Sequence, residues 1–314
     1  MVNKKIRSPL FYVGDKYKLI KEIKEYFPTN ISNFIEPFAG GGSVFMNIEA
    51  ESYFLNDIDK HVFGLHKFLI EQAKNSKLFF EQIDNLISKY GLSCSYKEDI
   101  VPKEVKEKWK KTYYAHFNKT SFERLKKDFN NSDETDMFHF YVLLIFGFNR
   151  MIRFNSSGEY NLPVGNVDFN KNVVTALNDY FQKVKNKKIS WFNLDYQCFV
   201  NSIKVSKNDF IYFDPPYLIT FSEYNKLWNE EKEIAFIEFL NALDKKKIKF
   251  AVSNVTQYKD RENMFFNNWA KNHNVIPIKS NYISYHDNSI KTFNEVLVTN
   301  YGTTNYEKKS YANL

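Results

Sequence analysis

The sequence predicts an α/β fold, a mostly parallel sheet covered by helices on both faces, with a second domain inserted into it. Three observations favour this fold. Short apolar runs typical of buried strands alternate with helix-like segments. Four of these runs end next to acidic residues or glycines. A long, charged and mostly helical stretch then separates the second apolar run from the third.

The expected elements follow in order along the chain. A strand at residues 34–38 precedes the glycine sequence AGGGS and an apolar, helix-like stretch at 44–48. A short strand at 53–55 ends at Asn56-Asp57. Further strands are expected at 189–192, 210–213, 248–252, 274–278 and 295–299, with a helix at 229–243. The last two strands are expected to pair in an antiparallel manner, which makes the sheet mixed.

The stretch between Asp57 and Ile189 is far longer than a single crossover connection requires. We therefore expect an inserted domain at residues 62–180, a catalytic domain made of 1–61 and 181–301, and a flexible tail at 302–314. Within the insertion, FNRMIRFNSSGEYNLPVG is typical of a β-hairpin, with strands at 151–154 and 160–162 around a turn at 155–158.

Composition narrows the function classes. The chain has 314 residues, 43% of them hydrophobic, and 44 Lys and Arg against 37 Asp and Glu, giving a net charge of +7. This moderate surplus suits an anionic partner. Cys94 and Cys198 have no metal-ligand spacing, so we expect free thiols and no metal site. MVNKKIRSPL lacks a signal-peptide core and no apolar run approaches 18 residues, so we expect a soluble cytoplasmic protein without a membrane partner.

Ligands of open α/β sheets collect at the carboxyl ends of the strands. Acids and glycines follow four expected strands and predict one crevice there, namely Glu36 with Gly40, Gly41 and Gly42, then Asp57, Asp195 and Asp214. Glycines let the backbone approach a ligand closely, and an acid after the second strand can accept ribose hydroxyls. Each signal alone also fits a tight turn or a helix cap. The glycine run fits neither the dinucleotide pattern, since Phe45 stands at the third glycine, nor the phosphate-loop pattern.

The sequence Asp214-Pro215-Pro216-Tyr217 after an apolar strand is a more specific signal. The amino nitrogen of adenine is a poor nucleophile because its lone pair is conjugated into the ring. Two acceptors on its two hydrogens, the Asp214 carboxylate and the Pro215 carbonyl, would favour tetrahedral geometry and free that pair. The prolines fix the direction of the carbonyl, and Tyr217 can stack on a flipped base. A sulfonium methyl donor held in line would complete the reaction, and no metal is needed.

Four segments resemble Dam-type DNA adenine methyltransferases (alpha group, D12 class), namely SPLFYVGDKYKLI, FIEPFAGGGS, LNDID and FDPPYLI. The resemblance runs from about Ser8 to Thr299 and is closest to the phage Dam enzymes. It implies a Rossmann-like mixed sheet that binds S-adenosyl-L-methionine, and a helical and hairpin target-recognition domain. It also implies site-specific methylation of a flipped adenine in double-stranded DNA by a bacterial or phage-encoded enzyme, a monomer or weak dimer.

The resemblance assigns roles residue by residue. For the donor it implies Tyr12, Lys16, Phe38, Ala39, Gly40, Gly42, Asp57, Asp195, Tyr196 and Asp214. For catalysis it implies Asp214, Pro215, Pro216 and Tyr217. For DNA it implies Phe148 as a wedge in the base stack, Asn149 beside the orphaned base, Met151 and Pro163 on the central A·T pairs, and Arg153 on a guanine. Without the resemblance, Arg153 would be expected to be a solvated residue, and Phe148 and Met151 would be expected to lie in the core. The lysines of the insertion fit phosphate contact and plain solubility equally.

Two departures concern the recognition sequence. Phe11 stands where bacterial Dam enzymes have a lysine, and Val167 where the family has Tyr or Arg. Both family positions touch the outer base pair, so the expected site is a short AT-centred palindrome, with GATC favoured and CATG the alternative. A nucleotide-cofactor oxidoreductase and a catalytically silent DNA-binding protein are the competing functions. Solitary, phage-borne and restriction-modification enzymes all share this chemistry.

Overall fold

The computed structural model describes residues 4–98, 100–132, 136–220, 228–279 and 293–302. The chain forms two compact units. We call the first the helical unit, which comprises Met1–Asp15, Gly40–Met46 and Asp59–Lys187. We call the second the sheet unit, which comprises Lys16–Ala39, Asn47–Ile58 and Lys188–Leu314. The tail expected at 302–314 lies, apart from Gly302, outside the described residues.

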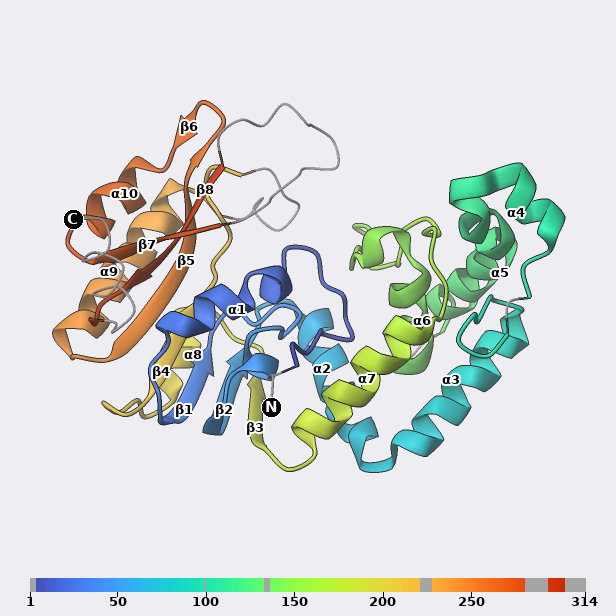
Figure 1. Ribbon diagram of the computed structural model, residues 1–314, viewed down its shortest axis with the longest axis horizontal. Helices are drawn as coiled ribbons and strands as arrows, with labels where there is room; N and C mark the ends of the chain where they lie inside the picture. The colour runs from blue at the N-terminus through green and yellow to red at the C-terminus, as the bar shows by residue number, and fades with distance from the viewer. Residues whose placement is uncertain (1–3, 99, 133–135, 221–227, 280–292, 303–314) are drawn as a thin grey trace. The chain divides into compact units, whose positions relative to one another are not determined.

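The sheet unit is built on a mixed sheet, as expected (Figure 1). Its described strands are β1 (Ile31–Glu36), β2 (Ala50–Asn56), β3 (Lys188–Phe192), β4 (Phe210–Phe213), β5 (Lys249–Tyr258), β6 (Arg261–Glu262), β7 (Asn274–Ile278) and β8 (Phe293–Thr299). Their order is β3-β2-β1-β4-β5-β8-β7, with β6 paired to β5. The pairs from β3 to β5 are parallel, and β8 is antiparallel to β5 and β7. The carboxyl ends of the first four strands therefore meet at one edge.

Both faces of this sheet are covered, which explains why its central strands are apolar on both sides. On one face, Ile211 and Phe213 of β4 pack with α8 (Tyr196–Ser202), α9 (Glu230–Lys245) and α10 (Met264–Ala270). On the other face, the Phe27 ring lies 4.7 Å from that of Phe210 and 5.2 Å from that of Tyr212. Phe27 follows α1 (Ile20–Ile23) and the 3-10 turns Lys16–Lys18 and Lys24–Tyr26.

The helical unit packs around one buried helix, α6 (Met137–Phe146), whose residues 140–146 are all fully buried. A helix that is apolar all round is stable only inside a core. Its N-terminus is capped by Asp136, which accepts hydrogen bonds from the amides of Phe138 and His139. The other helices are α2 (Lys60–Gln72), α3 (Ser76–Tyr90), α4 (Lys103–Trp109), α5 (Tyr113–Asn130) and α7 (Lys171–Val184), with 3-10 turns at Ala73–Asn75, Lys110–Thr112 and Phe148–Arg150. Among the described helices, none has the length and apolar character needed to cross a membrane.

Two expectations about local structure were wrong. The stretch at 44–48 forms only the 3-10 turn Phe45–Asn47, because Gly42 ends the glycine loop and β2 begins at Ala50, leaving no room for a helix. The segment 151–162 has the expected turn but no regular strands, only a single bridge between Phe154 and Tyr160. The Asn161 amide donates to the Arg153 carbonyl at 3.2 Å, but the Asn161 carbonyl accepts from the Arg153 guanidinium at 2.9 Å instead of from the Arg153 amide, so no ladder continues beyond this pair.

Candidate functional site

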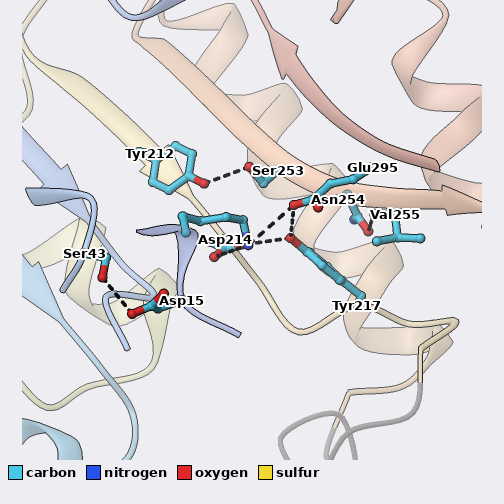
Figure 2. A network of polar contacts seen from close by, with 10 residues as sticks. Asp15, Ser43, Tyr212, Asp214, Tyr217, Ser253, Asn254, Val255 and Glu295 are labelled. Atoms are coloured by element: carbon cyan, nitrogen blue, oxygen red, sulfur yellow. Dashed lines mark hydrogen bonds and ion pairs between the residues drawn. The ribbon is translucent and has the colours of Figure 1, made fainter. Parts of the chain in front are cut away.

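Asp214 lies at the carboxyl end of β4 and both of its carboxylate oxygens are engaged within the sheet unit. The ammonium Nζ of Lys16 lies 2.7 Å from Oδ2, and the Tyr217 hydroxyl donates a 2.9 Å hydrogen bond to Oδ1 (Figure 2). Lys16 is buried and its Nζ also lies 5.1 Å from the centre of the Tyr217 ring. The structure thus brings together three residues that the sequence predicted, although it places Lys16, which was predicted for the donor, on the Asp214 carboxylate.

Glu295 of β8 belongs to the same network, and the sequence interpretation missed it. The residue is 5% exposed, and its Oε1 lies 3.2 Å from the Tyr217 hydroxyl and 3.7 Å from Nζ of Lys16. Burial and the two neighbouring carboxylates, Asp214 and Glu295, raise the pKa of Tyr217 well above its usual value. An acid inside the otherwise apolar strand EVLVT is the signal that could have indicated it, because buried carboxylates need partners.

Asn56, at the end of β2, joins the carboxyl ends of three strands. Its buried side-chain amide donates to the carbonyl oxygens of Pro37 and Leu194, each at 2.9 Å, and accepts from the Leu194 amide at 2.9 Å. The Asn56 carbonyl accepts from the Ala39 amide at 2.9 Å. Asp57 follows directly, and its carbonyl is held by the side chain of Asn193 at 2.8 Å. This bracing fixes the segments that carry Phe38, Asp57 and Asp195.

The rings of Phe38 and Tyr196, two predicted donor-site aromatics, lie 5.2 Å apart at 32° in the sheet unit. Tyr196 is buried, and the Trp228 ring meets Phe38 edge-on at 6.0 Å. Asp195 caps α8 by accepting a 2.9 Å hydrogen bond from the Gln197 amide, and it is exposed to solvent. The exposed acid Asp195 thus directly precedes Tyr196, one of the two rings in contact. A flat ligand with hydroxyl groups requires this combination.

In the helical unit, Tyr12 packs on the glycine loop. A Cβ at Gly41 would lie 2.7 Å from the Tyr12 Cβ, and a Cβ at Gly42 would lie 2.4 Å from the Phe45 ring. Gly42 also has a φ of +75°, which side chains rarely adopt. Tyr12 and the glycines that the sequence predicted for the donor are therefore together, and only glycine fits these positions.

A buried histidine holds this loop. His66 of α2 lies 2.9 Å through Nε2 from the Gly40 carbonyl and 3.2 Å through Nδ1 from the Tyr180 hydroxyl. Because a carbonyl only accepts, Nε2 carries the hydrogen and Nδ1 accepts from the hydroxyl. Burial lowers the pKa of His66 to about 4, so the ring is neutral at pH 7. The sequence interpretation missed His66, since nothing local points from α2 to the loop.

The five predicted DNA residues share one segment of the helical unit. Phe148, Asn149, Arg153 and Pro163 are exposed and Met151 is half-buried. Phe148 is 46% exposed, and its amide donates to the Pro163 carbonyl at 2.9 Å. Arg153 is anchored to Asn161 by bonds of 2.8 and 2.9 Å. Phe148 is thus an exposed apolar side chain on a braced backbone, unlike the core position that composition alone favoured.

Arg150, in the same segment, was not predicted. Its guanidinium stacks on the Phe11 ring at 3.9 Å, and Arg7 lies over the same ring at 4.7 Å. Asn149 and Arg150 have φ values of 52° and 51°, in the left-handed region that costs other residues strain. The Nε of Arg150 is buried and has no hydrogen-bond partner among the described residues. Phe11, noted above as a departure from the bacterial pattern, is therefore covered by two cations.

The mixed sheet, the glycine loop and the Asp-Pro-Pro-Tyr strand end define a class, the α/β methyltransferase fold with an amino-group methylation motif. The family model for the D12 class N6 adenine-specific DNA methyltransferases matches residues 12–283. The chain belongs to this family.

Curated relatives agree with the family. Modification methylase StsI of Streptococcus sanguinis is 33% identical over 315 residues, and type II methyltransferase M.FokI of Planomicrobium okeanokoites is 32% identical over 317 residues. These alignments cover 96% and 98% of this chain but 44% of each relative, so the chain spans less than half their length. The DNA adenine methylase of Vibrio cholerae serotype O1 is 27% identical over 218 residues, covering 68% of the chain and 66% of the relative.

Proposed function

We propose that this chain transfers a methyl group from S-adenosylmethionine to the exocyclic amino group of adenine in double-stranded DNA. The observation that carries the proposal is the position of Asp214, a half-buried carboxylate at the end of a buried strand, followed by two prolines and Tyr217. Family membership supports the adenine specificity.

The residues of the sheet unit act on the target base. Asp214 and the carbonyl of Pro215 accept the two amino hydrogens, which turns the nitrogen lone pair toward the methyl group. Lys16 and Tyr217 occupy only part of the acceptor capacity of Asp214, because each carboxylate oxygen has two lone pairs. S-adenosylmethionine would supply the methyl carbon for the new nitrogen–carbon bond, and its sulfur would keep the electron pair of the broken carbon–sulfur bond. The methylated nitrogen is acidic and then releases one proton to solvent.

S-adenosylmethionine supplies the methyl group on a positively charged sulfur. The structure offers it a glycine loop that a Cβ would fill and, in the sheet unit, an aromatic pair with neighbouring acids. We assign donor binding to Tyr12 and Gly40–Gly42 in one unit and to Phe38, Asp57, Asp195 and Tyr196 in the other. Asp57 takes the ribose hydroxyls in this assignment.

We assign DNA recognition to the segment with Phe148, Asn149, Met151, Arg153 and Pro163. An exposed Phe148 fits the wedge that fills the space of a flipped base. Arg153 is exposed and held by Asn161 through Nε and Nη2, and arginine is the side chain that most often reads a guanine edge. For the recognition sequence we propose an AT-centred site, with GATC tested first and CATG second.

The test is transfer of tritium from labelled S-adenosylmethionine to duplex DNA, comparing the wild type with Asp214→Ala. We expect label on adenine in the wild type and none above background in the variant. Full labelling by Asp214→Ala would contradict the role of the carboxylate, and an unlabelled DNA with the wild type would contradict the function. Sequencing of methylated DNA from cells that express the chain then gives the modified base and the site together.

A further inference from the structure

Glu295 is a buried carboxylate that the mechanism above does not use. It lies in β8, and the four residues that follow it are also buried. Burying a carboxylate is costly unless it is paired, and a buried strand position is ordinarily filled by an apolar residue. The charge of Glu295 therefore needs an explanation beyond packing.

Its neighbours give that explanation. Glu295 reaches the same two partners as Asp214. The Tyr217 hydroxyl lies 3.2 Å from Glu295 and 2.9 Å from Asp214 (Figure 2). Nζ of Lys16 lies 3.7 Å from Glu295 and 2.7 Å from Asp214. The hydroxyl has a single hydrogen, so its bond is shared between two carboxylates. The formal charges of the two acids and the one ammonium sum to −1, whereas those of Lys16 and Asp214 alone sum to zero.

That extra charge matters for methyl transfer to an amine. The target nitrogen becomes positive as the new bond forms, so an acceptor that remains negative stabilises the transition state more than the ground state. An Asp214 neutralised by its own lysine would be a weaker acceptor.

We propose that Glu295 is a positioning residue for the reaction. It shares Lys16 and the Tyr217 hydroxyl with Asp214, so that Asp214 keeps its negative charge toward the target amino group. This inference rests on the proposed function. It adds a residue from β8, a strand separated from β4 by β5, to the set that controls the catalytic carboxylate.

A glutamine separates the charge from the shape of this side chain. Glu295→Gln keeps the volume and an oxygen that can accept from Tyr217, but it removes the negative charge. Glu295→Asp keeps the charge and shortens the reach. The matched control is Glu262→Gln, an exposed glutamate of β6 whose carboxylate accepts from Asn267 at 2.8 Å.

The experiment uses the full chain with duplex DNA and labelled donor, and it measures both the single-turnover rate of methyl transfer and the steady-state KM for each substrate. We expect Glu295→Gln to lower the transfer rate about 10- to 100-fold. This is about the effect of removing one unit charge that lies 3.7 Å from the Lys16 ammonium in a partly polar interior. The KM values for DNA and donor should change less than about 3-fold, because the effect arises in the transition state. Glu295→Asp should recover part of the rate and Glu262→Gln should match the wild type. A Glu295→Gln rate within about 2-fold of the wild type, or a loss confined to KM, would overturn the proposal.

A second readout does not depend on activity. In protein labelled with ¹³C at the tyrosine Cζ, with the Tyr217 resonance assigned through Tyr217→Phe, the Cζ shift at neutral pH reports the hydrogen bonding of that hydroxyl. Glu295→Gln should move the resonance and Glu262→Gln should not. If the wild type fails to label DNA while the resonance moves, the proposed function fails and the network stands. If the resonance stays in place, Glu295 does not act on Tyr217 and the inference is refuted.

Discussion

Protonation of His66 should destabilise the fold in mild acid. The imidazole is fully buried, and burial lowers its pKa from 6.5 to about 4. Because the folded-state value lies below the unfolded one, the unfolded chain binds the proton more readily between these two pH values. Stability therefore falls as the pH falls through this window and levels off below pH 4. The shift of 2.5 (6.5 minus 4), at about 1.36 kcal/mol per unit, corresponds to about 3 kcal/mol in full, of which about 2 kcal/mol is lost between about pH 7 and about pH 4.5.

The assay is urea denaturation followed by circular dichroism at these two pH values. His66→Gln keeps an amide hydrogen for the Gly40 carbonyl and has no proton to gain, so its loss of unfolding free energy on acidification should be about 2 kcal/mol smaller than that of the wild type. The control is His116→Gln, which replaces an exposed histidine that stacks on Trp109 and lies outside the glycine loop. An equal acid-induced loss in His66→Gln and the wild type would refute the assignment of the pH dependence to this ring.

Three further predictions concern the loop and the DNA. Gly42→Ala should weaken S-adenosylmethionine binding more than about 10-fold, measured by calorimetry, since the new Cβ meets the Phe45 ring at 2.4 Å. Gly158→Ala, in a separate turn with a φ of +80° and open space, controls for the general cost of a side chain at positive φ, and equal binding by the two variants would contradict the steric argument. Arg153→Ala should lower the discrimination between bases at one position of the recognition site by about 1–3 kcal/mol. The measurement is the methylation rate on a panel of oligonucleotides that differ at single base pairs, and an unchanged preference would count against the role of Arg153. DNA affinity should fall steeply as salt rises, because phosphate contacts release counterions; a flat response in fluorescence anisotropy would exclude a charged DNA interface.

The strands could be predicted from the sequence because each is a short apolar run bounded by polar residues. Residues 210–213 and 274–278 were predicted with their observed bounds, and the antiparallel pairing of the last two strands was confirmed. β5 continues past its predicted end to Tyr258, because Ser253 and Asn254 are polar yet buried. A run of side-chain types does not show which polar residues will find partners in the core.

The candidate site was predictable only where local sequence carries the chemistry. The Asp214 motif and the glycine loop are each a continuous stretch of sequence, so both could be identified. Glu295 was missed because it is 78 residues from Tyr217, and Asn56 because its partner Leu194 is 138 residues away. Arg150 was missed because an arginine in a polar segment is normally a solvated residue, and only the fold places it on Phe11.

The chain passes between its two units at five places, after Asp15, Ala39, Met46, Ile58 and Lys187. Exchange of the helical unit between relatives is therefore more demanding than replacing residues 59–187 as one continuous segment. The N-terminal segment belongs to the same unit, where the Pro9 carbonyl accepts from Tyr141 at 3.1 Å and Phe11 stacks on Arg150. A chimera that keeps residues 1–15 of this chain but takes residues 59–187 from a relative would lack both contacts. The segment from the relative therefore needs to be transferred together with that relative's counterpart of residues 1–15.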